Sequence, residues 1–228
     1  MPFRLPSRFR PAKIHSMTTL TPSVNRISAE LLERLGNVPL DRIRFDPPPG
    51  MATIADLDHP RNQRCELVDG TLVEKTVGWK ESRVGLWIGT LLNNYIIPRN
   101  LGATSGEQGF MELEEGLVRG PDFAFISWDR LPEDLPAFPA MVPDFVVEVL
   151  SLSNTKAEML RKREEYFRTG VHLVWEVDPR LRTVTVFSSV AEFTVTVEGD
   201  TLRGEPVLPG FEVEVSQIFA EMDRGRNS

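Results

Sequence analysis

The sequence predicts an α+β domain, and three observations lead to that prediction. Two apolar runs of strand length occupy residues 123–126 and 145–150. Apolar residues recur at helical spacing in residues 79–97, and a capped, charged helix is expected after Thr155. Near the C-terminus, residues 182–187 and 193–197 alternate apolar with polar side chains, which predicts an antiparallel meander.

The length and composition predict one domain with a sizeable core. The chain has 228 residues, of which 41% are hydrophobic and 26% are charged. Residues 1–45 read as a loosely attached N-terminal extension that contains one short helix, at residues 27–35, capped by Ser28. The rigid Asp46-Pro-Pro-Pro-Gly50 segment then opens the domain proper, residues 46–228.

Charge and cysteine content exclude several classes of protein. The net charge of −7 argues against strong non-specific binding of nucleic acid through a basic surface. No stretch of about eighteen apolar residues predicts a membrane span, and no apolar segment follows the basic N-terminus as in a secretory signal, so a cytoplasmic protein is expected. The single cysteine, Cys65, and three scattered histidines favour neither a disulfide nor a zinc site.

The remaining elements follow from local signals. Asp69-Gly70 between two short apolar segments is a strong hairpin signal, and Pro98 should stop the long helix. The expected elements are a short helix from Thr53, the hairpin 65–74, the helix 79–97, a strand 106–113, a buried strand 171–177 and a terminal helix 216–222.

Two acidic residues interrupt the central apolar runs. Asp122 precedes the first run, and Glu148 stands among valines in the second. If the two runs are neighbouring strands, Asp122 and Glu148 can meet at one end of them. Two carboxylates at apolar strand ends are best tolerated with a divalent cation or a basic residue between them. Because all these ligands are oxygens, Mg²⁺ or Mn²⁺ is favoured over zinc.

The helix after the second run offers a basic residue. Thr155 and Glu158 form a capping-box pattern, and Gly170 is placed to end the helix. Lys162 lies at the edge of the apolar stripe, so its ammonium can reach toward the sheet. Tyr166, four residues on, could hydrogen-bond a site carboxylate. Two carboxylates and a cation are groups that could flank a metal-bound water and a phosphate.

These residues carry a family resemblance. The phrases Pro-Asp, Pro-Asp-Phe-Val-Val-Glu-Val-Leu-Ser, Lys-Arg-x-x-Tyr and Gly-Val-x-x-x-Trp-x-Val-Asp-Pro resemble the putative restriction endonuclease family long catalogued as a domain of unknown function, within the PD-(D/E)XK nuclease superfamily. The resemblance implies a restriction-endonuclease-like mixed central sheet flanked by helices. It also implies Mg²⁺-dependent hydrolysis of DNA, with Mn²⁺ as an alternative ion. A homodimer is expected because cutting both strands needs two sites.

The resemblance also assigns residues. It implies that Asp122 and Glu148 are metal ligands, assisted by the backbone carbonyl of Val149. The lysine that positions the attacking water usually lies two residues after the glutamate, where this chain has Leu150. Lys162 on the neighbouring helix is therefore the expected lysine. Lys156 is the second choice.

Two further acidic positions match the family pattern. Glu66 stands in the Glu-Leu-Val-Asp-Gly phrase of the predicted hairpin, which carries an acidic residue near the active site in the family. Glu107 matches another acidic position, and a solvated edge-strand glutamate is its plain alternative.

Two alternatives to an active nuclease remain. Leu150 and the acidic net charge are compatible with a catalytically degenerate relative that uses the same fold as a binding or interaction module. Paired acids alone would also suit a carboxylate-based phosphatase or glycosidase.

Overall fold

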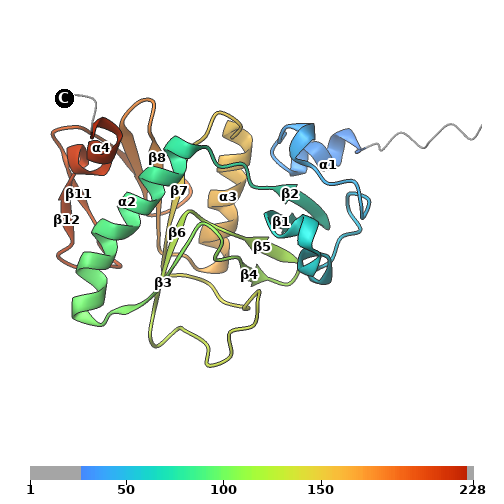
Figure 1. Ribbon diagram of the computed structural model, residues 1–228, viewed down its shortest axis with the longest axis horizontal. Helices are drawn as coiled ribbons and strands as arrows, with labels where there is room; N and C mark the ends of the chain where they lie inside the picture. Colours follow the sequence, from blue (N-terminus) through green and yellow to red (C-terminus); the bar gives the residue numbers. More distant parts are fainter. Residues whose placement is uncertain (1–26, 225–228) are drawn as a thin grey trace, which may run out of the picture.

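A six-stranded mixed sheet forms the centre of the protein (Figure 1). The computed structural model describes residues 27–224. The strand order is β10-β9-β8-β7-β6-β3, with β7 and β8 parallel and every other neighbouring pair antiparallel. The strands are β3 (Gly102–Gly106), β6 (Phe123–Ser127), β7 (Phe145–Val149), β8 (Leu173–Asp178), β9 (Thr183–Phe187) and β10 (Phe193–Val197). The mixed sheet and the antiparallel β8-β9-β10 meander confirm the sequence prediction.

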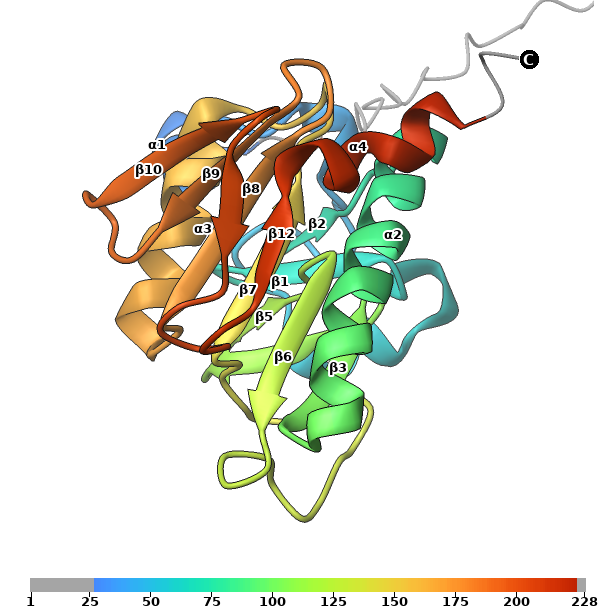
Figure 2. The same ribbon diagram turned by 90° about the vertical axis from the view of Figure 1, so that its left-hand side faces the viewer.

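One face of this sheet is covered by α2 and the C-terminal elements (Figure 2). Helix α2 (Trp79–Ile96) passes into a 3₁₀ turn, η4 (Ile97–Arg99), at Pro98. It packs against α4 (Val215–Asp223), beside the small antiparallel pair β11 (Thr201–Arg203) and β12 (Glu212–Glu214). The odd-numbered side chains of β7 face this layer, because successive side chains on a strand point to opposite faces.

The other face is covered by α3 (Lys156–Thr169) and a second, four-stranded antiparallel sheet. Its order is β2-β1-β5-β4, and its strands are β1 (Cys65–Val68), β2 (Thr71–Glu74), β4 (Met111–Glu114) and β5 (Leu117–Arg119). The β1-β2 hairpin turns at Asp69 and Gly70, both with positive φ, as the Asp-Gly signal predicts. Glu148 points to this face, toward α3.

Helix α3 connects the parallel strands β7 and β8, and its ends follow the sequence signals. The Thr155 hydroxyl accepts from the Glu158 backbone N–H, and the Glu158 carboxylate accepts from the Thr155 N–H. Gly170 ends the helix in the left-handed conformation at φ 109°. Lys162 and Tyr166 are four residues apart and therefore share one face of the helix, which points inward, and both side chains are buried.

The segment before residue 46 is packed into the fold from residue 27 onward. It contains α1 (Ala29–Arg34) and η1 (Leu40–Arg42), and η2 (Ile54–Asp58) and η3 (Pro60–Asn62) follow it. Leu35, Val38 and Ile43 are each at most 4% exposed and join the core beneath α3. The expectation of a loosely attached extension is therefore wrong for residues 27–45. Residues 1–26 lie outside the described part of the chain.

One predicted strand is two segments separated by a turn. The expected strand 106–113 is divided, since Gly106 ends β3 and the next strand starts at Met111. The Gly109 N–H donates to the Gly106 carbonyl at 2.7 Å, which closes a tight turn around Glu107. Glu107 thus lies in a loop rather than on an edge strand. Within residues 27–224, the helices are all too short or too polar to cross a membrane.

Candidate active site

The pairing of β6 with β7 brings Asp122 and Glu148 to one end of the central sheet. Phe123 is opposite Val147, and the Asp122 N–H donates to the Val147 carbonyl at 3.0 Å, so Asp122 lies beside Glu148. Both carboxylates line one pocket of about 10 Å³, which has room for about one water molecule. The meeting of these two acids, expected from the strand pattern, is confirmed.

Helix α3 places two donors on Glu148. The Lys162 ammonium lies 3.1 Å from Oε1 of Glu148, and the Tyr166 hydroxyl donates to the same oxygen at 2.6 Å. The two side chains are four residues apart and therefore share one face of the helix. Oε1 receives all the hydrogen bonds that the Glu148 carboxylate accepts from the described residues. Its second oxygen is left for another partner in the pocket.

Glu66 lies behind Lys162, on the side away from the pocket. Its Oε1 is 3.0 Å from the Lys162 ammonium, and its Oε2 accepts from Arg119 at 2.7 Å. Arg119 also binds Glu165 of α3. Glu66 is completely buried and does not line the pocket. The hairpin therefore supplies a carboxylate that holds Lys162, and this acid does not itself face the pocket.

The two glutamates that share Lys162 have different electrostatic environments. Burial raises the pKa of Glu66, but the charges of Lys162 and Arg119 outweigh burial and hold this pKa well below its usual range. Burial also raises the pKa of Glu148, and here Lys162 and Lys75 do not fully offset it, because Asp122 and Glu66 repel the charge. Glu148 is thus the carboxylate of the pair whose charge is less compensated.

Lys75 is a site residue that sequence reasoning missed. It follows β2 directly, and its ammonium lies 2.7 Å from Oδ1 of Asp122 and donates to the Gly120 carbonyl at 2.6 Å. The other oxygen of Asp122 accepts from the Val149 N–H at 2.6 Å. Alternation along β2 is the signal that could have found it, because Lys75 continues the face of Val73, which is paired with Glu66.

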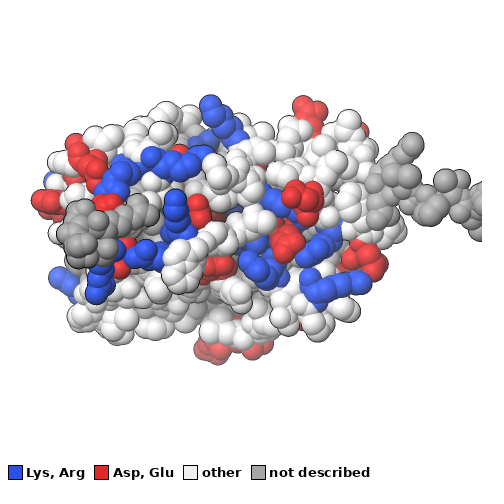
Figure 3. Space-filling view, turned by 45° about the horizontal axis from the view of Figure 1, so that its top comes forward, with Lys and Arg blue, Asp and Glu red and all other residues white. Residues whose placement is uncertain are grey.

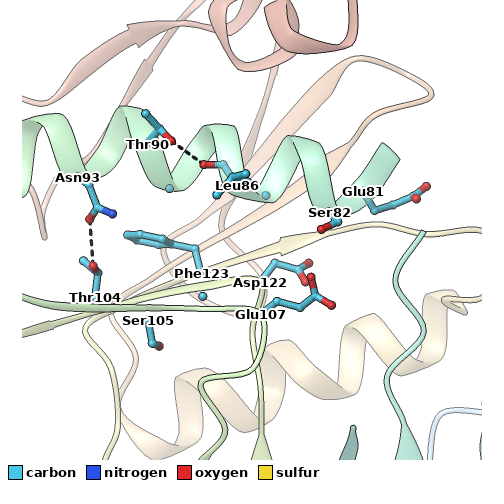
Figure 4. Close-up of a pocket in the computed structure, with 13 residues that line it drawn as sticks. Glu81, Ser82, Leu86, Thr90, Asn93, Thr104, Ser105, Glu107, Asp122 and Phe123 are labelled. Carbon is cyan, nitrogen blue, oxygen red and sulfur yellow. Dashed lines mark hydrogen bonds between the residues drawn. The ribbon is translucent and has the colours of Figure 1, made fainter. Parts of the chain in front are cut away.

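A groove of about 390 Å³ opens beside Asp122, between α2 and β3 (Figure 4). Its long side is lined by neutral polar groups, among them Ser82, Asn93 and Thr104. Asp122 and Glu107 both line the groove, and both are drawn toward the same end of it in the view of Figure 4. The small pocket and the groove share Asp122 and Glu81, so these two acids connect the buried charges around Lys162 with the groove.

The remaining residues that the sequence singled out differ in whether they line the pocket. Val149 lines it, whereas Leu150 does not. Lys156 is exposed on the first turn of α3 and lines no part of the pocket. Arg42, by contrast, lines it and forms a buried ion pair with Glu158.

The surface charge is mixed. On the face drawn in Figure 3, Lys and Arg side chains are interspersed with Asp and Glu. Of the Lys and Arg residues between positions 27 and 224, none lines the 390 Å³ groove. A separate set of charged side chains, among them Glu66, Arg119, Glu148 and Lys162, is buried in the interior.

Comparison with known proteins adds a family and a fold. The model of the Uma2 family, described as putative restriction endonuclease, matches residues 51–216. A crystal structure described as a putative nuclease belonging to DUF820, from Anabaena variabilis ATCC 29413, is similar in fold, with a TM-score of 0.63 and 17% sequence identity. The similarity covers 68% of this chain and 89% of that one. No curated protein matches. The restriction-endonuclease-like α+β fold is thereby confirmed.

Proposed function

Because the chain belongs to the Uma2 family of putative restriction endonucleases, we propose that it is a metal-dependent nuclease that hydrolyses phosphodiester bonds of DNA. The observation that carries the proposal is the meeting of Asp122 and Glu148 at one pocket, with an open groove beside it. Burying a carboxylate charge on an apolar strand costs free energy unless the charge binds a cation or another partner. In a family of putative restriction endonucleases, the partner that two such carboxylates would bind is a divalent metal ion that promotes phosphodiester hydrolysis.

The donor set fits Mg²⁺ or Mn²⁺. Asp122 and Glu148 offer oxygen ligands, and the backbone carbonyl of Val149 could add a third. Within residues 27–224 no group of three or more His, Cys, Asp or Glu side chains is arranged to hold a metal ion. This agrees with Mg²⁺, which is commonly held by one or two carboxylates and keeps several waters. When bound, the ion would lower the pKa of a water and neutralise phosphate charge.

Lys162 is the proposed water-positioning residue. An ammonium has three N–H donors, and two of those on Lys162 are directed to Glu66 and Glu148. Lys162 lines the pocket, so its third donor can orient a water there. Tyr166 and Glu66 would act by fixing Glu148 and Lys162, and neither needs to touch the substrate.

The groove between α2 and β3 is the proposed path of the DNA strand. It leads to Asp122, and its lining of hydroxyl and amide groups can hydrogen-bond sugar and phosphate oxygens. Glu107 stands at the Asp122 end, where negative charge opposes a phosphate unless a cation lies between them. Since none of the basic residues that the structure describes lines the groove, DNA should bind weakly without divalent ions and with little dependence on monovalent salt.

We further propose that the active form is a homodimer, because cleavage of both strands requires two sites. Light scattering at working concentrations measures this directly. A monomer that cuts only one strand would restrict the proposal to nicking.

The second candidate is a degenerate nuclease that serves as a binding module. It is favoured by Leu150 at the usual lysine position and by Lys75, which already neutralises Asp122. On this account the buried charges around Lys162 are structural, and neither metal binding nor cleavage depends on Asp122.

The test uses Glu148→Gln and Asp122→Asn, with Glu164→Gln as control because Glu164 is an exposed acid of α3. Supercoiled plasmid is incubated with each protein and Mg²⁺ or Mn²⁺, and ion binding is followed by calorimetry. The nuclease proposal expects both site variants to lose cleavage and tight ion binding, with the control unchanged. Cleavage that survives in Glu148→Gln removes the proposal, and wild-type protein that neither binds ions nor cuts favours the binding module.

A further inference from the structure

Lys75 is bound to one of the proposed metal ligands. Its ammonium contacts Oδ1 of Asp122 at 2.7 Å and the Gly120 carbonyl at 2.6 Å. The residue is 8% exposed, and its backbone N–H is fixed to the Arg64 carbonyl at 2.8 Å. This is a specific interior contact, made by a side chain long enough to move without moving the backbone.

The two proposed ligands differ in how far they are already occupied. On Glu148, Lys162 and Tyr166 both bind Oε1, and Oε2 accepts nothing from the described residues. On Asp122, the Val149 N–H takes Oδ2 and Lys75 takes Oδ1. Glu148 is therefore open to an incoming cation on one oxygen, whereas Asp122 is engaged on both.

Space makes the contact of Lys75 incompatible with a second cation on the same oxygen. The pocket that Lys75, Asp122 and Glu148 line has only about 10 Å³, room for about one water molecule. A divalent ion bound to Oδ1 would lie within a few ångströms of the ammonium, and like charges at that distance in a buried site repel strongly.

We infer that Lys75 is a positioning residue that occupies the metal-binding oxygen of Asp122 and leaves it when a divalent ion binds. The inference rests on the proposed function, because it takes Asp122 as a metal ligand. Lys75 keeps the buried Asp122 charge compensated while no ion is present, and it makes ion binding an exchange of one cation for another. It therefore lowers the affinity for metal by occupying a ligand oxygen, whereas Lys162 binds Oε1 of Glu148 and leaves Oε2 open.

The test compares Mn²⁺ binding by calorimetry in wild type, Lys75→Met, Lys80→Met and Asp122→Asn. Methionine keeps most of the stem of Lys75 and removes the charge, and Lys80 is an exposed lysine that controls for the loss of one positive charge. Removing a charge in contact with the ligand should tighten Mn²⁺ binding about tenfold in Lys75→Met. Lys80→Met should bind as wild type does.

The outcomes separate this inference from the proposed function. Mn²⁺ binding that depends on Asp122 but is unchanged or weaker in Lys75→Met overturns the role of Lys75 and leaves the metal site standing. Binding that persists in Asp122→Asn, or that is absent from both wild type and Lys75→Met, overturns both. Binding that appears only in Lys75→Met supports both.

A second measurement follows the lysine side chains by NMR and uses the wild-type protein alone. In wild-type protein labelled with ¹⁵N at its lysines, the Nζ signal of Lys75 should shift and exchange faster with solvent on titration with Mg²⁺, because the ammonium loses a buried partner. The Nζ signal of the exposed Lys80 serves as the internal reference. A Lys75 signal that stays constant while Mg²⁺ binds contradicts the exchange.

Discussion

Arg42 and Glu158 form a two-point ion pair, in which Nη1 of Arg42 donates to Oε2 of Glu158 at 2.9 Å and Nη2 donates to Oε1 at 2.8 Å. Both side chains are at most 4% exposed. The contact links the segment before the first sheet to the start of α3, across 116 positions of the chain. It therefore helps to hold the helix that carries Lys162.

Arg42→Ala should lower the free energy of unfolding by about 3–5 kcal/mol, because it leaves a buried carboxylate without its partner. Urea denaturation measures the loss. Arg44→Ala is the control, since the Arg44 pair with Glu74 is partly exposed and should be worth about 1 kcal/mol or less. Equal, small losses in the two variants would contradict a structural role for the Arg42 pair.

Lys162→Met should destabilise the fold by about 3–5 kcal/mol, since Glu66 and Glu148 would lose the cation they share. Adding Glu148→Gln to this variant should restore part of the loss by removing one of the uncompensated charges. Lys156→Met, at an exposed position of the same helix, should change stability by about 0.5 kcal/mol or less. Chemical denaturation of wild type, Lys162→Met, Glu148→Gln and the double variant gives the coupling energy, and strictly additive effects would be inconsistent with the shared cation.

Tyr166→Phe should raise the pKa of Glu148 further, because the carboxylate loses the hydroxyl donor at 2.6 Å. Protons then compete better with metal, so Mn²⁺ affinity should fall relative to wild type and fall most at low pH. Stability should drop by about 1–3 kcal/mol for the lost buried hydrogen bond. Calorimetry across pH measures the first effect, with Tyr95→Phe, a surface hydroxyl, as the matched control. An affinity ratio that is independent of pH would argue against it.

Glu176 predicts a pH dependence of stability. Burial raises its pKa to about 7, only partly opposed by Arg163. Because this folded-state pKa is above the unfolded value, the folded state holds the proton more tightly, and stability falls as pH rises through about 7. Glu176→Gln should flatten this fall, leaving the variant less pH-sensitive by about 2 kcal/mol between pH 5 and 8.

The measurement for Glu176 is urea denaturation across that pH range. Glu164→Gln, an exposed acid on α3, should keep the wild-type slope. If the free energy of unfolding of Glu176→Gln depends on pH as that of wild type does, another residue is the titrating group.

Much of the site follows from local pattern. Asp122 and Glu148 stand out because each is a single acid beside an apolar strand, and alternation along β7 correctly places Glu148 on the α3 face. Lys162 and Tyr166 follow from the capping box and from helical spacing. The same local rules failed at residues 106–113, where two glycines permit a turn that hydrophobicity alone reads as continuous strand.

The burial of two other cations could not be predicted in this way, although alternation along β2 gives the face on which Lys75 lies. Lys75 and Arg119 are buried only because the second sheet folds onto the first, and the Arg119 contact with Glu66 joins residues 53 positions apart. In sequence, each stands next to polar or turn residues, where a basic side chain is usually solvated. Whether such a residue is buried or exposed depends on contacts between segments that are far apart in the sequence.

The Arg42 contact also bears on how this domain could be excised. Family similarity begins at residue 51, yet Arg42 lies upstream of that point and clamps the start of α3. A chain that starts at residue 51 would keep every proposed metal ligand. It would lose the Arg42–Glu158 ion pair and the buried side chains of Leu35, Val38 and Ile43. A stable excised domain should therefore start at about residue 27, because the region of family similarity is shorter than the region that packs into the fold.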